Sequence, residues 1–128
     1  MRVKTTIDYP IEEVKRLCAV ASRGINHKGF TIWIKNSRHA YAGRAYLYRN
    51  YAVVRVGRPE HYPLQAHYRG LKRAPYFTLN NWQEAIVAVV AHELRHLQQY
   101  KLRKPRSEVD AERWAVKRLD AYRETIGK

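Results

Sequence analysis

Apolar residues recur at the spacing of one helical face between Asp8 and Gly24. Pro10 suits a first helical turn, the acidic residues after it suit the positive end of a helix, and Gly24 is a typical stop. We therefore expect an N-terminal helix whose apolar face carries Ile11, Val14, Leu17, Cys18 and Ala21.

Three segments after this helix are rich in β-branched and aromatic residues and predict strands at Phe30–Lys35, Ala40–Tyr48 and Tyr51–Gly57. The short interval Arg49–Asn50 between the last two predicts a tight turn, and hence a small antiparallel sheet. Another short strand is expected at Pro75–Leu79, after a basic and aromatic loop that is long enough to be functional.

The segment Asn80–Leu102 has the strongest helical pattern in the chain. Asn81, followed by Glu84 three residues later, is typical of a capping box at a helix start. The run Ala85–Ala91 is apolar all round, which indicates a helix buried on most sides. A last helix is expected over Ser107–Glu124, with the serine as its cap.

These elements predict one α+β domain over residues 1–128, a length that suits a single core. In it, a small antiparallel β-sheet packs on the N-terminal, central and C-terminal helices. The one cysteine, Cys18, excludes an internal disulfide and fits a reducing compartment. No segment has the pattern of a signal peptide or a membrane span, so we expect a cytoplasmic protein with no membrane partner.

The central helix contains the sequence "HELRH", in which His92 and His96 are one helical turn apart on one face. That spacing lets two imidazoles bind a single zinc ion, each at about 2.0–2.1 Å. Glu93 is rotated by about 100°, so it can reach a water beside the metal and act as the catalytic base. A chance match on an ordinary helix is the alternative, and Arg95 is an unusual residue inside such a motif. Burial at the end of an apolar helix favours the metal, because unpartnered His and Glu would be costly there.

A catalytic zinc site needs a third protein ligand, and the last helix offers one. Its small, apolar inward face is interrupted by two carboxylates at the N-terminal end, those of Glu108 and Glu112. A turn at Lys104–Pro105 would bring this helix start back near the histidines. Glu108 is the candidate third ligand, and Glu112 can accept a hydrogen bond from the distal nitrogen of a liganding histidine. The alternative is surface charge, because helix starts attract Glu by their dipole alone.

The stretches "HELRH" and "SEVDAERWA" resemble the gluzincin metallopeptidases, and the layout of elements is similar to that of the one-domain minigluzincins. The resemblance is specific over His92–Ala115. It implies that Glu108 is the glutamate ligand and that Glu112 stands where the family has an aspartate. The stretch "AGRAYLYRNYAVVRV" is also similar to SprT-like proteases, which use a third histidine. No histidine follows His96 to serve as that third ligand, so we prefer the interpretation as a gluzincin-like protein.

The resemblance implies a zincin-like fold and peptide-bond hydrolysis by a zinc-activated water, with Glu93 as general base and a protein or peptide substrate. It also implies that the peptide substrate lies beside an edge strand of the sheet. By analogy, that strand would be "YAVVRV" or "PYFTL" in this chain. The substrate-binding residues are unknown. The second donor to the reaction's oxyanion stays open among His61, His67, Tyr68, Tyr76, Tyr100 and Tyr122.

Charge supports a second hypothesis. The chain has 25 Lys and Arg against 11 Asp and Glu, a formal net charge of +14, which favours nucleic acid as a partner. Aromatic and basic residues also interleave in the segment His61–Tyr76. The alternative to a peptidase is therefore a basic nucleic-acid-binding module with a structural or vestigial zinc site. The two combine in a protease that acts on DNA-bound proteins.

Overall fold

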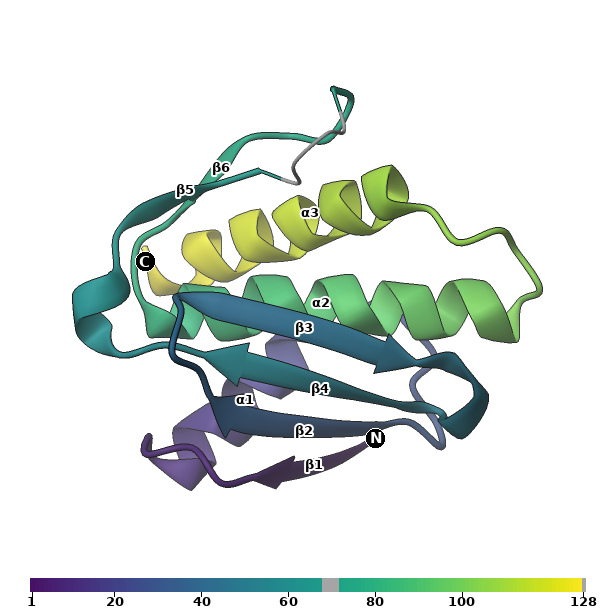
Figure 1. The fold of residues 1–128 in the computed structure, drawn as a ribbon, viewed down its shortest axis with the longest axis horizontal. Coiled ribbons are helices and arrows are strands. Elements are labelled where there is room, and N and C mark those ends of the chain that lie inside the picture. The colour runs from purple at the N-terminus through teal and green to yellow at the C-terminus, as the bar shows by residue number, and fades with distance from the viewer. Residues whose placement is uncertain (68–71, 128) are drawn as a thin grey trace.

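The computed structural model describes residues 1–67 and 72–127, and within them the chain forms three α-helices, a four-stranded sheet and a two-stranded sheet (Figure 1). This confirms the predicted α+β class. In chain order the elements are β1 (Arg2–Thr5), α1 (Ile11–Ala21), β2 (Thr31–Asn36), β3 (Tyr41–Tyr46), η1 (Leu47–Arg49), β4 (Tyr51–Val56), η2 (Pro59–His61), β5 (Leu64–Ala66), β6 (Phe77–Leu79), α2 (Trp82–Lys101) and α3 (Glu108–Ile126).

The four-stranded sheet is mixed, with strand order β1-β2-β4-β3. Strands β1 and β2 run parallel, as do β2 and β4, whereas β3 and β4 are antiparallel. The expected all-antiparallel sheet is therefore wrong for two of its three strand pairs. Helix α1 crosses from β1 to β2, a connection that parallel strands require, and β4 returns between β2 and β3. Strand β1 was not predicted at all.

Strand β4 lies inside this sheet, and β3 is the edge strand. The expectation that "YAVVRV", residues Tyr51–Val56, is an exposed edge is therefore wrong. The hairpin predicted after β3 is looser than a two-residue turn, because η1 intervenes and Asn50 closes the connection with a φ of 54°. The other candidate strand, "PYFTL", forms β6 and pairs with β5.

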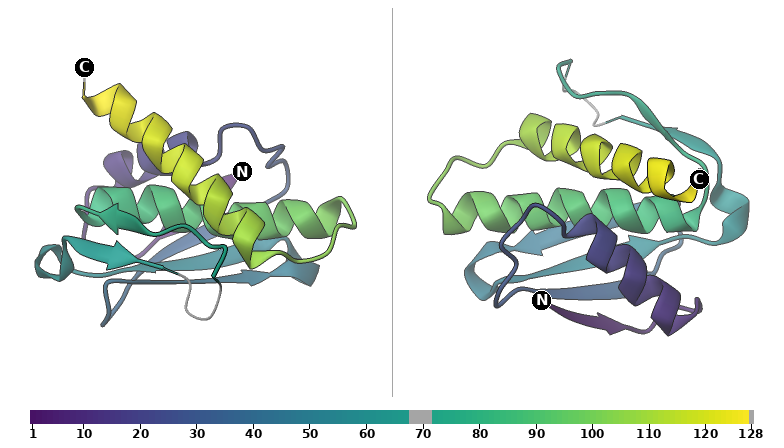
Figure 2. Two further views of the ribbon diagram at one scale, coloured as in Figure 1. Left: turned by 90° about the horizontal axis from the view of Figure 1, so that it is seen from above. Right: turned by 180° about the vertical axis from the view of Figure 1, so that it is seen from behind.

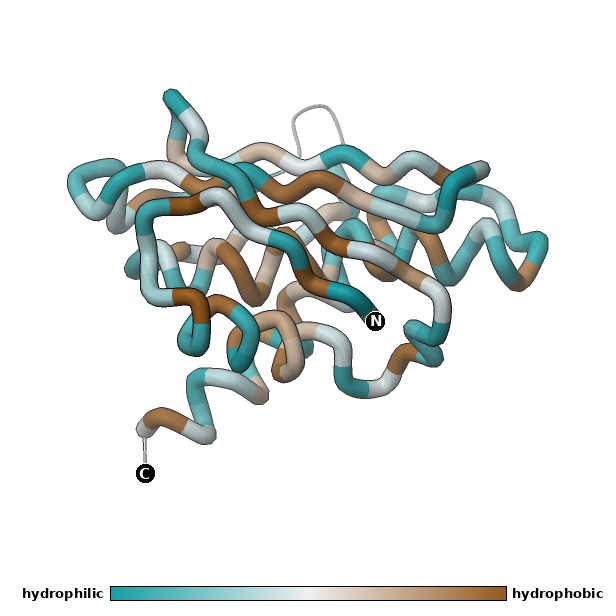
Figure 3. Tube along the Cα trace, turned by 90° about the horizontal axis from the view of Figure 1, so that it is seen from below, coloured by the Kyte–Doolittle hydropathy of each residue, from teal (hydrophilic) through white to brown (hydrophobic). Residues whose placement is uncertain are grey.

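Helices α1 and α2 cover one face of the four-stranded sheet, and no described element covers the other (Figure 2). Hydrophobic and hydrophilic positions alternate along the strands (Figure 3), so every second residue faces the helices. Helix α2 packs against α1, α3, β3 and β4, and the whole run Ala85–Ala91 is buried, as its sequence predicts. No helix in the described part of the chain is both long and apolar enough to cross a membrane.

Candidate metal centre

The two histidines of α2 face α3 from the middle of the molecule. His92 and His96 are 8% and 1% exposed, and their Nε2 atoms lie 3.1 Å apart. Together with Glu93 they form a buried group whose possible ligand atoms all lie within 4.8 Å of one another. The apolar run before them keeps this part of α2 against the sheet, as expected for a helix that is buried on most sides.

The start of α3 brings Glu108 beside both histidines. Its Oε2 lies 3.0 Å from His92 Nε2, and its Oε1 lies 3.0 Å from His96 Nε2. The connection between the helices is held by Gln99, whose side chain exchanges hydrogen bonds of 3.1 and 3.2 Å with the backbone of Ser107. Ser107 in turn caps α3, as predicted. Three residues predicted as ligands therefore meet at one point.

The spacing of these atoms fits a tetrahedral zinc ion. Two ligand atoms about 2.05 Å from one ion, at the tetrahedral angle, lie about 3.3 Å from each other. The two Nε2 atoms are 3.1 Å apart, and each lies 3.0 Å from a different oxygen of Glu108, Oε2 for His92 and Oε1 for His96, so the separations are close to that value. Little movement would be needed to place an ion among the three residues.

The distal nitrogens of both histidines also have partners. His92 Nδ1 lies 2.6 Å from Glu112 Oε1, the contact that the sequence suggests for this glutamate. His96 Nδ1 lies 3.0 Å from Gln99 Oε1, a partner that the sequence did not indicate. Donation from Nδ1 leaves each Nε2 with a lone pair for a metal. The one available signal for Gln99 is its position, three residues after His96 on the same helical face.

The electrostatics of the site favour added positive charge. Although burial alone lowers it, hydrogen bonds with Glu108 and Glu112 raise the pKa of His92 to about 9. The hydrogen bond with His92 in turn lowers the pKa of Glu108 to about 2. The glutamates thus stabilise positive charge at His92, whereas burial lowers the pKa of His96 and favours its neutral form, the form that binds a metal.

Glu93 lies beside the possible ligands. Its Oε1 is 3.8 Å from His92 Nε2, and its buried Oε2 has no hydrogen-bond partner among the described residues. Burial raises the pKa of Glu93 to about 7. Strand β3 passes close above it, since a Cβ added at Gly43 would lie 3.0 Å from both Cγ and Oε1 of Glu93. A buried carboxylate oxygen without a partner among the described residues is available to accept a proton, as a general base must.

Arg95 and Asp110 connect the two helices beside the site. Arg95 Nε and Nη2 lie 2.8 and 3.1 Å from the two oxygens of Asp110, and Gln99 Nε2 donates to the same carboxylate at 2.9 Å. The arginine that is unusual inside the motif therefore has a structural partner. Asp110 is partly exposed and bridges α3 to α2.

A pocket of about 310 Å³ opens in front of Glu93. His92, Glu93 and Glu112 of the centre line it, together with two further polar residues, Tyr41 and His67. The rest of the lining is apolar or glycine: Gly43, Phe77, Leu79, Ala88 and Val89. Of the residues considered as oxyanion donors, His67 lines this pocket, while Tyr68 lies outside the described residues. The others, His61, Tyr76, Tyr100 and Tyr122, do not line it.

Tyr41 is a further donor in this pocket that the sequence did not indicate. Its hydroxyl makes no hydrogen bond with any described residue, whereas His67 Nε2 is 3.1 Å from the carbonyl oxygen of Ala74. Burial and the nearby Glu112 raise the pKa of Tyr41, so its hydroxyl stays protonated. Tyr41 is thus free to donate to a molecule in the pocket.

Comparison with known proteins adds no family to this description, since no family model, curated protein or solved structure matches the chain.

Proposed function

We propose that this protein is a zinc-dependent metallopeptidase with a gluzincin-like ligand set. The observation that carries the proposal is the position of Glu108, which lies 3.0 Å from the Nε2 atoms of both His92 and His96. A chance motif on one helix would not require a carboxylate from a second helix at that point. The buried Cys18 is consistent with a reducing, cytoplasmic location.

Each polar residue of the centre has a role in this proposal. His92, His96 and Glu108 hold one zinc ion, while Glu112 and Gln99 orient the two imidazoles. Zinc, when bound, lowers the pKa of a water molecule and polarises a substrate carbonyl group. Glu93 accepts a proton during the attack and returns it to the leaving amine.

The substrate is proposed to be an extended peptide along the free edge of β3. This strand passes directly over Glu93 at Gly43, and in its pairing with β4 only one of its edges is used. A strand added there would place its backbone in front of the base and one side chain in the apolar pocket. Because Gly43 has no side chain, the backbone of β3 can lie this close to Glu93.

The test separates metal binding from chemistry. Wild-type protein purified in excess zinc is expected to hold one zinc per chain and to cleave a mixture of quenched fluorescent peptides. Glu93→Gln should keep its zinc and lose cleavage, whereas Glu108→Gln should lose much of its zinc affinity. Glu124→Gln, on an exposed part of α3, serves as the matched control. Wild-type protein that binds no zinc would refute the proposal.

A further inference from the structure

The uncovered face of the four-stranded sheet carries a group of basic and aromatic side chains, the basic–aromatic face. Its cations are Arg2, Lys4, Lys35, Arg44 and Arg55, and its rings are Trp33, Tyr46 and Tyr51. These residues alternate with buried ones such as Ile32, Ile34 and Val54, so they point away from α1 and α2. Most of them line one groove of about 490 Å³.

Strand register places cations and rings next to one another on this face. Lys4 pairs with Trp33, and the Nζ atoms of Lys4 and Lys35 lie 4.9 and 5.3 Å from the centre of the Trp33 ring. Arg44 lies 5.2 Å from the Tyr46 ring, which stacks on Tyr51 at 4.6 Å. Flat rings and flexible cations therefore share one surface.

This surface carries no negative charge of its own. None of the four strands contains an Asp or a Glu, although the chain has 11 of them. No carboxylate on the same strands therefore neutralises the cations of this face.

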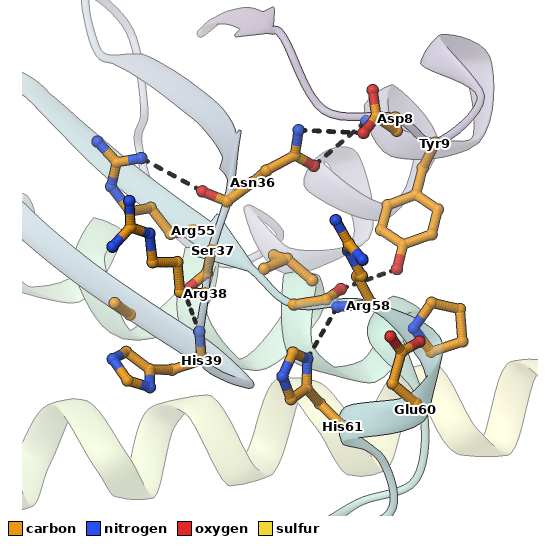
Figure 4. Close-up of a pocket in the computed structure, with 14 residues that line it drawn as sticks. Asp8, Tyr9, Asn36, Ser37, Arg38, His39, Arg55, Arg58, Glu60 and His61 are labelled. Atoms are coloured by element: carbon orange, nitrogen blue, oxygen red, sulfur yellow. Dashed lines mark hydrogen bonds between the residues drawn. The ribbon is translucent and has the colours of Figure 1, made fainter.

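The positive surface continues around the end of the sheet into a pocket of about 1030 Å³ (Figure 4). Arg38, Arg55 and Arg58 line this pocket, and the Nη1 of Arg55 donates to the carbonyl of Asn36 at 3.2 Å. Two carboxylates also line the pocket: that of Glu60, and that of Asp8, which accepts a hydrogen bond from the Asn36 amide at 3.3 Å. A chain of phosphates leaving the basic–aromatic face would thus meet further arginines.

We propose that the basic–aromatic face binds single-stranded nucleic acid. The cations bind phosphates, and the three rings stack on unpaired bases, whose faces a duplex would hide. A membrane surface fits less well, because the exposed large hydrophobic side chains all lie outside the four strands: Ile11, Tyr48, Tyr76, Tyr100, Leu102 and Ile126. An acidic protein would match the charge but would not need the rings.

The inference is independent of the metal centre, and it assigns nucleic-acid binding to the sheet. The segment His61–Tyr76, which also mixes aromatic and basic residues, includes positions outside the described range. The face uses the side chains of β3 that point away from the pocket, so substitutions there need not disturb zinc.

The test measures fluorescence anisotropy of labelled oligonucleotides of about 15 nucleotides at low salt. The probes are single-stranded DNA, single-stranded RNA and a DNA duplex of equal length, and vesicles rich in phosphatidylserine compete with them. Binding is expected to be tighter to single strands than to the duplex and to weaken steeply with salt. The DNA and RNA arms identify which strand is preferred. No binding to either strand, tighter binding to duplex, or displacement by vesicles would overturn the proposal.

Charge reversal localises the surface. The pair Lys35→Glu and Arg44→Glu is expected to weaken binding at least about ten-fold and to reduce the salt slope by roughly one to two. The pair Arg113→Glu and Lys117→Glu, exposed on α3, changes the net charge equally and should have much less effect. Equal losses in both pairs would show only a response to net charge and would contradict the proposal.

Stacking is tested at Trp33. Trp33→Ala is expected to weaken binding about five-fold or more, while Trp33→Phe should restore most of the affinity because a ring remains. Circular dichroism checks that both variants are folded. If Trp33→Ala folds and binds like wild type, the stacking part of the proposal is wrong. Glu93→Gln should bind oligonucleotides normally, because Glu93 does not line the groove of the basic–aromatic face. Nucleic-acid binding can therefore be established even if the protein does not cleave peptides.

Discussion

At the scale of single residues, the pocket is defined by what β3 presents to α2. Gly43 brings the backbone against Glu93, and Tyr41 supplies a hydroxyl with no partner among the described residues. Neither residue belongs to the zinc motif, and both are about 50 residues away from it in the chain. Their importance comes from the packing of a strand on a helix, and it is open to test.

Replacing Gly43 is expected to disturb the base without removing the metal. The Cβ of Gly43→Ala would lie 2.8 Å from Val89 Cγ1 and 3.0 Å from the Glu93 carboxylate, so that carboxylate must move. A shift of about 1 Å in a catalytic group can cost about a hundred-fold in rate. Peptide cleavage should therefore fall at least about ten-fold at unchanged zinc content. Ala42→Ser, next to it on the same strand, is the control, and wild-type cleavage by Gly43→Ala would count against the role of Gly43.

Tyr41 is expected to donate a hydrogen bond to the oxyanion of the reaction. Tyr41→Phe should lower kcat by about a hundred-fold and leave KM and zinc content nearly unchanged, as for loss of one such donor. Tyr46→Phe removes a hydroxyl from the same strand outside the pocket and should cleave normally. If Tyr41→Phe retains full activity, Tyr41 is not the donor. Among the described residues His67 is then the other candidate in the pocket, and His67→Gln tests it.

At the scale of elements, α2 and α3 are joined at both ends. Near the metal centre the contact runs through Arg95, Gln99 and Asp110. At the other end Glu84, which is 3% exposed, accepts hydrogen bonds from Arg123 at 2.7 and 3.2 Å. The two connections fix the angle between the helices and so the position of Glu108.

The connection through Glu84 predicts a pH-dependent stability. Burial by itself raises the pKa of Glu84, but hydrogen bonds with Arg123 and Asn80 outweigh it and lower the pKa. The carboxylate therefore stabilises the fold above its unfolded pKa, and this contribution is lost as pH falls through the lower folded value. Glu84→Gln should cost about 2 kcal/mol at neutral pH.

The measurement is urea unfolding near neutral pH and at about pH 3.5, which is below the ordinary glutamate pKa of about 4.3, so that Glu84 is mostly protonated in the unfolded chain. The difference between wild type and Glu84→Gln should shrink at the lower pH. Glu124→Gln, with an exposed carboxylate on the same helix as Arg123, should differ little from wild type at either pH. A difference that stays constant with pH would rule out the charged form as the source.

What the sequence predicted well was local. The helix expected at Asn80–Leu102 is α2, and the inward face of the last helix correctly indicated that Glu108 and Glu112 lie near the histidines. Periodicity encodes which side of a helix is buried, and a short connection leaves little freedom in how two helices pair. Whether Glu108 binds metal stays a prediction.

What the sequence did not reveal depends on distant partners. Alternation identifies a strand and its buried face but not the direction of its neighbour, so the parallel pairs of β2 were missed. A glutamine is usually a surface residue, so the sequence gives no reason to place Gln99 in the site. Its side chain is held beside His96 by hydrogen bonds with the backbone of Ser107, which comes from the next helix start. Tyr41 joins the site because β3, and not β4, is the edge strand.

At the scale of the whole molecule, β3 separates two proposed activities. On one side of β3, the side chain of Tyr41 and the backbone of Gly43 line the pocket in front of Glu93. On the other side, Arg44 and Tyr46 belong to the basic–aromatic face. A peptide along this edge would lie next to a nucleic-acid strand on the sheet. The arrangement would suit a peptidase that acts on proteins held by single-stranded nucleic acid.

Zinc is expected to stabilise the whole fold, because its proposed ligands come from both α2 and α3. Free zinc at about a thousand times its dissociation constant would stabilise the native state by about 4 kcal/mol. For a domain of this size, that corresponds to a rise in Tm of roughly 10 °C or more. Calorimetry with zinc and with a chelator measures the difference.

Two variants distinguish a specific centre from metal bound elsewhere. Glu108→Gln should lose most of the zinc-dependent rise in Tm, because one of three ligands is neutralised while its size is kept. The Lys35→Glu and Arg44→Glu pair should keep the full rise, since the basic–aromatic face is separate from the centre. Equal Tm values for wild-type protein with zinc and with chelator would mean that the clustered His92, His96 and Glu108 are held together by their own hydrogen bonds and not by a metal.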